Sequence, residues 1–152
     1  MQEALAAAGL PCRVVELPAS TRTAKEAAAA IGCRVEEIAK TVVFRRADDD
    51  GPVLVVASGG TRVDERRVGA LLGAPVRQAD PDFVRAATGY AIGGVPPLGH
   101  RRPIPTFLDE GLLGFATVWA AAGTPHAVFS LTPAELVTAT GARVAPLAVS
   151  PA

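Results

Sequence analysis

Signals that start and stop helices recur at four places along this chain, and they fix where helices can lie. Each start is a side chain able to accept a hydrogen bond from a free backbone N–H, or an acidic first turn. Each stop is a glycine, which adopts the left-handed conformation that ends a helix at little cost. A fifth short helix is expected in the alanine-rich residues 1–10. The four signalled helices run from Thr23 to Gly32, Asp64 to Gly73, Asp80 to Gly89 and Thr132 to Gly141.

Short runs rich in β-branched and aromatic residues lie between these helices and predict strands. The runs are 12–17, 41–46, 53–58, 76–78, 104–108, 115–119, 127–131 and 143–147. Residues 53–57 are all apolar, so we expect that strand to be covered on both faces or to line a closed barrel. Helices and strands do not alternate strictly, as they would in a doubly wound sheet. The predicted fold is α+β, a mixed, curved, partly barrel-like β-sheet surrounded by helices, in one domain spanning residues 1–152.

Composition limits the classes of function that the chain can perform. Acidic and basic residues number 15 each, so a nucleic-acid contact would need a local patch. Three arginine pairs are candidates, although each also fits a solvated, mixed-charge surface: Arg45-Arg46, Arg66-Arg67 and Arg101-Arg102. No apolar run approaches the ~20 residues of a membrane span and no secretory signal is present, so we expect a cytoplasmic protein. The two cysteines and two histidines match no zinc-ligand spacing, and we expect neither a metal nor a cofactor.

Lys40 is one of two lysines beside thirteen arginines, and it lies where a helix is expected to run into an apolar strand. Burying an unpaired cation is costly. A lysine ammonium is a compact charge with a shiftable pKa, suited to gripping an anionic group or a developing charge. The alternative is that the Lys40 stem covers apolar surface while its ammonium stays in water.

Residues 91–106 form a long connection with three glycines and four prolines and no secondary-structure pattern. Loops of this length are usually functional or disordered. Prolines and apolar side chains favour order here. Glycine lets the backbone approach a ligand closely, and successive N–H groups can form a concavity for a phosphate, a carboxylate or an oxyanion. The alternative is a rigid crossover between strands.

Lys40 in Ala-Lys-Thr-Val-Val-Phe, together with residues 93–100, resembles the YbaK/ProX family of aminoacyl-tRNA deacylases, relatives of the editing domain of bacterial prolyl-tRNA synthetases. Further matches are Ser58-Gly59-Gly60, Phe107-Leu108-Asp109 and the run 119–126. The resemblance spans residues 11–149. It implies a partly closed mixed sheet with helices around it. It also implies hydrolysis of the ester that joins a wrong amino acid to the 3′ end of a tRNA, with no metal and no covalent intermediate. The implied partners are a mischarged tRNA and, in addition, an aminoacyl-tRNA synthetase.

The resemblance also implies roles for single residues. The catalytic candidates are Lys40, which would contact a phosphate or the ester oxygens, and Gly94 and Gly99, whose N–H groups would stabilise an oxyanion. The expected substrate-binding residues are Thr41, Gly93, Val95, Pro96, Pro97, His100 and His126. Each histidine has an alternative role. His100 would be a hydrogen-bonded loop residue facing the tRNA, and His126 a residue at a strand start that caps backbone carbonyls.

Two departures from the family's sequence pattern leave open which amino acid is removed from the tRNA. Pro96 stands where many relatives carry serine or threonine, so a hydroxyl contact is lost. The segment 124–126 lacks the basic residue and glycine usual in cysteine-clearing relatives. Alanine, serine, threonine, cysteine or another small amino acid therefore remain candidates. The competing functions are a non-catalytic module that binds the acceptor end of tRNA or a synthetase, and a hydrolase of an unrelated small ester or amide. Asp109 is expected to cap the turn at Glu110-Gly111.

Overall fold

The computed structural model of this protein describes residues 1–10, 13–100 and 102–149. Some sequence expectations extend to positions outside these ranges: the first residue of the strand expected at 12–17, Arg101 of the third arginine pair and of the connection 91–106, the start of the resemblance at 11–149, and the end of the domain 1–152. The helical elements are α1 Gln2–Ala7, α2 Ala24–Ile31, the 3₁₀ helix η1 Val35–Glu37, α3 Glu65–Leu72, α4 Pro81–Thr88, the 3₁₀ helix η2 Glu110–Gly114 and α5 Pro133–Thr140. The strands are β1 Val15–Glu16, β2 Ile38–Arg46, β3 Pro52–Ser58, β4 Val76–Gln78, β5 Thr106–Asp109, β6 Val118–Ala121, β7 Ala127–Leu131 and β8 Arg143–Ala145.

The four signalled helices begin and end as the sequence predicts. The side chains of the four N-cap residues each accept a hydrogen bond from a first-turn N–H: Thr23, Asp64, Asp80 and Thr132. The four glycines that follow the last turns all have positive φ, between 65° and 86°. Helix boundaries could be read from the sequence because a cap depends on residues within one turn of it.

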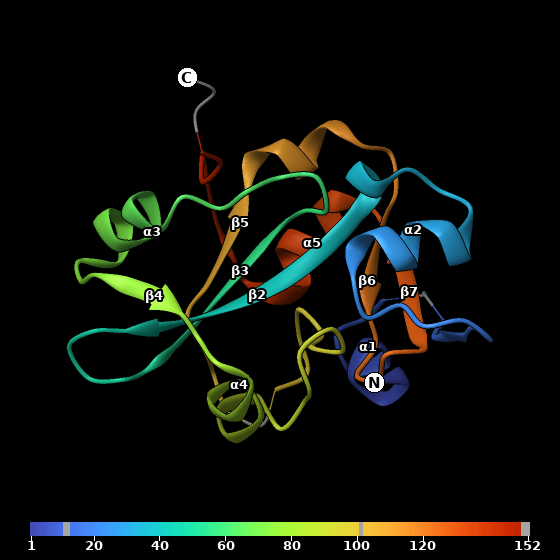
Figure 1. Ribbon diagram of the computed structural model, residues 1–152. Coiled ribbons are helices and arrows are strands. Elements are labelled where there is room, and N and C mark those ends of the chain that lie inside the picture. The colour runs from blue at the N-terminus through green and yellow to red at the C-terminus, as the bar shows by residue number, and fades with distance from the viewer. Residues whose placement is uncertain (11–12, 101, 150–152) are drawn as a thin grey trace.

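The strands form a mixed sheet in the order β1-β7-β6-β2-β3-β5-β8, with β4 added beside β2. β2 pairs antiparallel with β3 and parallel with β6, and β3 pairs parallel with β5. In Figure 1, β2 and β3 cross the middle of the molecule, β4 lies at one end of β2, and β6 and β7 lie at the other. The mixed α+β architecture is confirmed. The strand path ends at β1 and β8, so the sheet is not closed.

The outer edge of β2 is interrupted halfway along the strand. β6 pairs with Ile38 and Ala39, whereas β4 pairs with residues 44–46. The stretch between these two pairings has no strand beside it on that edge in the described part of the chain. This break in the sheet positions the candidate site.

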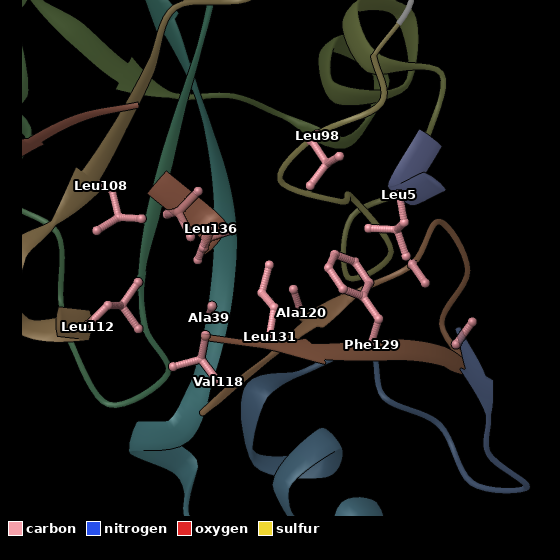
Figure 2. Packing of buried hydrophobic residues seen from close by; sticks show 13 residues of the cluster. Leu5, Ala39, Leu98, Leu108, Leu112, Val118, Ala120, Phe129, Leu131 and Leu136 are labelled. Carbon is pink, nitrogen blue, oxygen red and sulfur yellow. The ribbon is translucent and has the colours of Figure 1, made fainter. Parts of the chain in front are cut away.

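The core covers both faces of β3, as its continuous apolar run predicts. Residues 53–57 are each at most 1% exposed, and they contribute to three different clusters of buried side chains. Figure 2 shows the largest cluster, where Leu5 of α1, Leu136 of α5 and Phe129 of β7 meet. Leu98 from the long loop joins them, and burying a leucine side chain stabilises by ~1.5–3 kcal/mol. The loop is therefore anchored in the core.

β2 starts at Ile38, three residues before its predicted start at Thr41. The reason is that Ile38 and Ala39 pair with Trp119 and Ala120 of β6, a distant partner that local sequence does not reveal. Lys40 consequently lies inside a strand, after a single 3₁₀ turn, and not at a junction with an α-helix. The strand expected at 115–119 lies instead at Val118–Ala121.

Candidate functional site

A cavity of about 260 Å³ lies at the break in β2. Its walls are residues 21–24 at the start of α2, residues 38–43 of β2, residues 78–79 at the end of β4 and residues 119–121 of β6, together with part of the long loop. Among the described residues that line it, only Arg22 and Lys40 carry a charge. The same lining contains no aspartate, glutamate or histidine. The cavity is therefore a small, largely apolar site with two cationic residues in its lining.

The ammonium of Lys40 is half-buried beside this cavity. Its Nζ donates a hydrogen bond to the carbonyl oxygen of Thr61 at 2.5 Å. Lys40 makes no ion pair with any acidic group in the described part of the chain. Burial lowers the pKa of Lys40 from its ordinary value of 10.5, because the charged form loses water. The side chain thus holds a poorly compensated positive charge against a single carbonyl.

Thr41 follows Lys40 on β2 and also lines the cavity. Its hydroxyl oxygen is buried and has no hydrogen-bond partner among the described residues. Buried hydroxyls in native proteins are nearly always bonded, so such an atom requires an explanation. A ligand bound in the cavity beside β2 would supply the missing partner.

The first part of the long loop reaches the cavity, at Gly93 and Val95. Gly93 has φ of +88°, and a Cβ at this position would lie 2.5 Å from the carbonyl oxygen of Arg22. The loop therefore packs directly on the segment before α2 and closes that wall. Gly94 is buried against the backbone of Thr124: a Cβ added at Gly94 would lie 3.2 Å from the carbonyl carbon of Thr124. Gly94 is not among the residues that line the cavity.

The second part of the loop turns away from Lys40. Pro96 and Pro97 are buried, and neither lines the cavity. Gly99 lies against Met1 and Ala4 at α1, where an added Cβ would come within 3.1 Å of both side chains. The structure thus brings Gly93 and Val95 beside Lys40 and Thr41, but it does not bring Gly99 there. The placement of Gly94 and Gly99 favours packing roles for them.

Both histidines lie outside the cavity lining. The Nε2 of His100 is 2.8 Å from the Pro96 carbonyl oxygen, and its Nδ1 is buried without a partner among the described residues. Burial lowers the pKa of His100, and its ring meets Tyr90 edge-on at 5.7 Å between centroids. His126 is exposed, with its Nδ1 3.3 Å from the carbonyl oxygen of Ala19. These contacts fit the alternative roles given for the two histidines: His100 as a hydrogen-bonded loop residue and His126 as a residue that caps a backbone carbonyl.

Several residues that line the site were not predicted to do so, among them Arg22 and Ala79, and Trp119 was noted only as part of the matched run 119–126. Arg22 immediately precedes the capping residue Thr23, which gives no hint that its backbone meets Gly93. Ala79 and Trp119 flank the cavity because they lie at the ends of β4 and β6. Only the pairing of these strands with β2 reveals that position.

Other sequence candidates have more ordinary surroundings. Arg45 pairs with Asp50 and Arg46 with Asp48, each at 2.9 Å on the surface, which fits the mixed-charge reading of that arginine pair. Asp109 accepts a hydrogen bond from the Gly111 N–H, as predicted, and a second from the Leu147 N–H. Within the described ranges, no three His, Cys, Asp or Glu side chains are grouped to hold a metal ion. None of the helices formed by the described residues combines the length and apolar character that crossing a membrane requires.

Comparison with known proteins gives consistent matches. A sequence model of the family described as aminoacyl-tRNA editing domain matches residues 18–139. The uncharacterized protein YwhH of Bacillus subtilis is 36% identical over 123 residues, which cover 81% of this chain and 78% of YwhH. EbsC of Enterococcus faecalis, a candidate Cys-tRNA(Pro)/Cys-tRNA(Cys) deacylase, is 29% identical over 119 residues, 72% of each chain.

Solved structures agree with these sequence matches. The crystal structure of a candidate trans-editing enzyme for prolyl tRNA synthetase superposes with a TM-score of 0.90 at 53% identity, over 98% of this chain and 94% of that one. The crystal structure of the hypothetical protein APE2540 gives the same TM-score at 37% identity, over 97% of both chains.

Proposed function

This chain belongs to the aminoacyl-tRNA editing domain family, and we propose on that premise that it hydrolyses mischarged aminoacyl-tRNA in trans. The bond cleaved is the ester between a small, wrongly attached amino acid and the 3′ end of the tRNA. The single observation that carries the proposal is the cavity at the break in β2, where the half-buried ammonium of Lys40 makes no ion pair with an acidic group of the described residues.

The chemistry required of such a site is modest. An aminoacyl ester is already activated, so the protein needs to hold the ester, admit one water and stabilise the oxyanion that forms. The ammonium of Lys40 is the group that would contact the terminal phosphate or the ester oxygens. Arg22 lies at the same cavity and adds positive charge for the nucleotide. Because no carboxylate or histidine lines the site, we propose that the ribose hydroxyl of the substrate orients the water.

The size of the cavity supports a small amino acid. Pockets for drug-sized ligands span ~300–1,000 Å³. A cavity of about 260 Å³ whose walls include Val95 and Ala120 has little room for a large side chain. Alanine, serine, threonine and cysteine remain the candidates. We propose Gly93 and Val95 as the loop residues that contact the substrate.

A deacylation screen tests this proposal directly. Purified protein is incubated with several tRNAs charged with alanine, serine, threonine or cysteine, and release of the amino acid is measured. Lys40→Ala should lower the fastest of these rates at least ~10²-fold, the scale of losing one oxyanion-stabilising group. Lys25→Ala is the matched control, because Lys25 is the other lysine and lies exposed on α2.

Two results would overturn the proposal. Turnover by Lys40→Ala at the wild-type rate would remove the lysine from the mechanism. Binding of the tRNAs without hydrolysis across the panel would favour a non-catalytic module that recognises the acceptor end. Since one structural relative is named for prolyl tRNA synthetase, that synthetase is the first partner to add when the protein alone is slow.

A further inference from the structure

The backbone of Thr41 faces the break in β2, as the strand register shows. The N–H of Leu54 in β3 donates to Pro105 at 2.9 Å, so Leu54 directs its polar groups away from β2. Its partner Val43 must then direct its own groups away from β3. The Val43 carbonyl accepts a hydrogen bond from the Ala79 N–H at 3.1 Å, which confirms that it points away from β3. The backbone polar groups of successive strand residues point to opposite edges, so residues two apart share an edge. Thr41 lies two residues before Val43, and its N–H and C=O therefore also point away from β3.

Neither neighbouring ladder reaches Thr41. The pairing with β6 stops at Ala39, and the pairing with β4 starts at Phe44. Six consecutive residues, 38–43, line the cavity although their side chains alternate between the two faces of the sheet. The cavity therefore meets the strand edge-on. With its unpartnered hydroxyl, Thr41 presents three polar groups at a position where a strand residue is missing.

A free α-aminoacyl group has the chemistry that fits this position. Its amine and its acyl carbonyl are separated by one carbon, as the N–H and C=O of a strand residue are. The lining contains no carboxylate for an ammonium, so a backbone carbonyl is the acceptor available there. We propose that the peptide groups of Thr41 hold the aminoacyl group of the substrate as the missing residue of the sheet. The amine donates to the Thr41 carbonyl, and the Thr41 N–H donates to the ester carbonyl oxygen.

This arrangement assigns the Thr41 N–H a place in the hydrolysis, and the inference rests on the proposed function. Water adds to the acyl carbon, and the carbonyl electron pair moves onto the oxygen that the Thr41 N–H faces. The oxyanion then re-forms the carbonyl and expels the ribose oxygen, which takes a proton originating from the water. The products are a free amino acid and a tRNA with an intact 3′ hydroxyl. A hydrogen bond to the developing oxyanion strengthens during the first of these steps.

The substrate side of the proposal is tested with amine-free esters. A tRNA carrying alanine is compared with the same tRNA carrying propionate, or the equivalent pair for whichever amino acid is released fastest. Each enzymatic kcat/KM is divided by the hydroxide-catalysed rate of the same ester, because the amine also activates the ester chemically. We expect the normalised value to fall about 10- to 100-fold without the amine, the scale of a hydrogen bond to a charged group.

The protein side is tested by exchanging one backbone amide for an ester, using the α-hydroxy acid analogue of threonine at position 41. This exchange removes the Thr41 N–H and also weakens the Lys40 carbonyl as an acceptor, but the register directs that carbonyl toward β3 and away from the cavity. Loss of the N–H should lower kcat about 10²–10³-fold. The control places the α-hydroxy acid analogue of phenylalanine at position 44, where the register directs the N–H toward Val53 of β3 and away from the cavity. That change should weaken the sheet and leave kcat unaltered.

The outcomes separate the two levels of the argument. If no ester of the panel is hydrolysed, the proposed function fails. If esters with and without the amine are hydrolysed equally after normalisation, or if the Thr41 exchange leaves kcat unchanged, pairing with the strand edge is refuted while the hydrolase stands.

Discussion

Gly93 and Gly32 offer a matched pair of substitutions that measures how tightly the long loop closes on the site. Their φ values are nearly equal, +88° and +86°. An added Cβ at Gly32 meets nothing within 4 Å, whereas at Gly93 it would lie 2.5 Å from the Arg22 carbonyl oxygen and 2.9 Å from the Arg22 Cα. Both variants therefore force an alanine into the same unfavourable left-handed conformation. Only Gly93→Ala also brings the new Cβ too close to backbone atoms.

The expected magnitudes follow from these two contributions. A left-handed alanine costs ~1–2 kcal/mol, so Gly32→Ala should lower the free energy of unfolding by about that amount. Overpacking against atoms that cannot rotate away costs a further ~1–3 kcal/mol. Gly93→Ala should then lose about 2–5 kcal/mol. Urea denaturation followed by circular dichroism at one temperature gives both values.

Activity adds a second readout. Gly93 and Arg22 both line the cavity, so a Cβ that pushes them apart should reduce deacylation by Gly93→Ala under conditions where the variant is still folded. Gly32 lies at the far end of α2 and should leave the rate unchanged. Stability losses that agree within ~0.5 kcal/mol for the two variants would refute the close packing of the loop on residues 21–23.

Three further predictions follow from buried polar groups. Because burial lowers the pKa of Lys40 below 10.5, deacylation that needs its ammonium should decline with rising pH before pH 10.5, after subtraction of spontaneous hydrolysis; a rate that holds through that range would contradict the role of the charge. The pKa of His100 lies below 6.5 in the folded protein, so the unfolded chain binds more protons and the free energy of unfolding should fall as the pH drops below 6.5. In urea titrations at several pH values, His100→Asn should show a smaller decrease than wild type. Asp109 is 2% exposed and accepts from the N–H groups of Gly111 and Leu147, so Asp109→Ala should cost ~2–4 kcal/mol, and a loss below ~1 kcal/mol would show that these groups find other partners.

The sequence predicted those features that depend on neighbours along the chain. Thr132 and Gly141 fix the two ends of α5 through contacts within one turn, and both were predicted correctly. The continuous apolar run of β3 correctly predicted a strand buried on both faces. The start of β2 was predicted three residues late, because the pairing of Ile38 with Trp119 depends on a strand from the far end of the chain.

The site was predictable only in part, for the same reason. Lys40 and Gly93 are both unusual in their local sequence, and they line one cavity. The first part of the long loop lines the cavity and the second part turns away from it. This difference was not predictable, because it depends on Val95 and Leu98 packing in different clusters of the core. Nor could the gap beside Thr41 be foreseen. Among the described residues, the gap exists because β6 stops pairing with β2 at Ala39 and β4 starts at Phe44, and the amino acid at position 41 does not reveal where those distant strands end.

The short gap beside Thr41 also limits what can pair with this edge of β2. An exposed strand edge is ordinarily a template on which a second chain can add a ladder. Here β2 lacks a neighbouring strand only on its outer edge and only between Ala39 and Phe44, with β6 at one end of the gap and β4 at the other. A foreign strand, typically ~5–6 residues long, would collide with one of these neighbours before a ladder could grow. The opening can thus present main-chain donors and acceptors to a small molecule while denying them to another polypeptide.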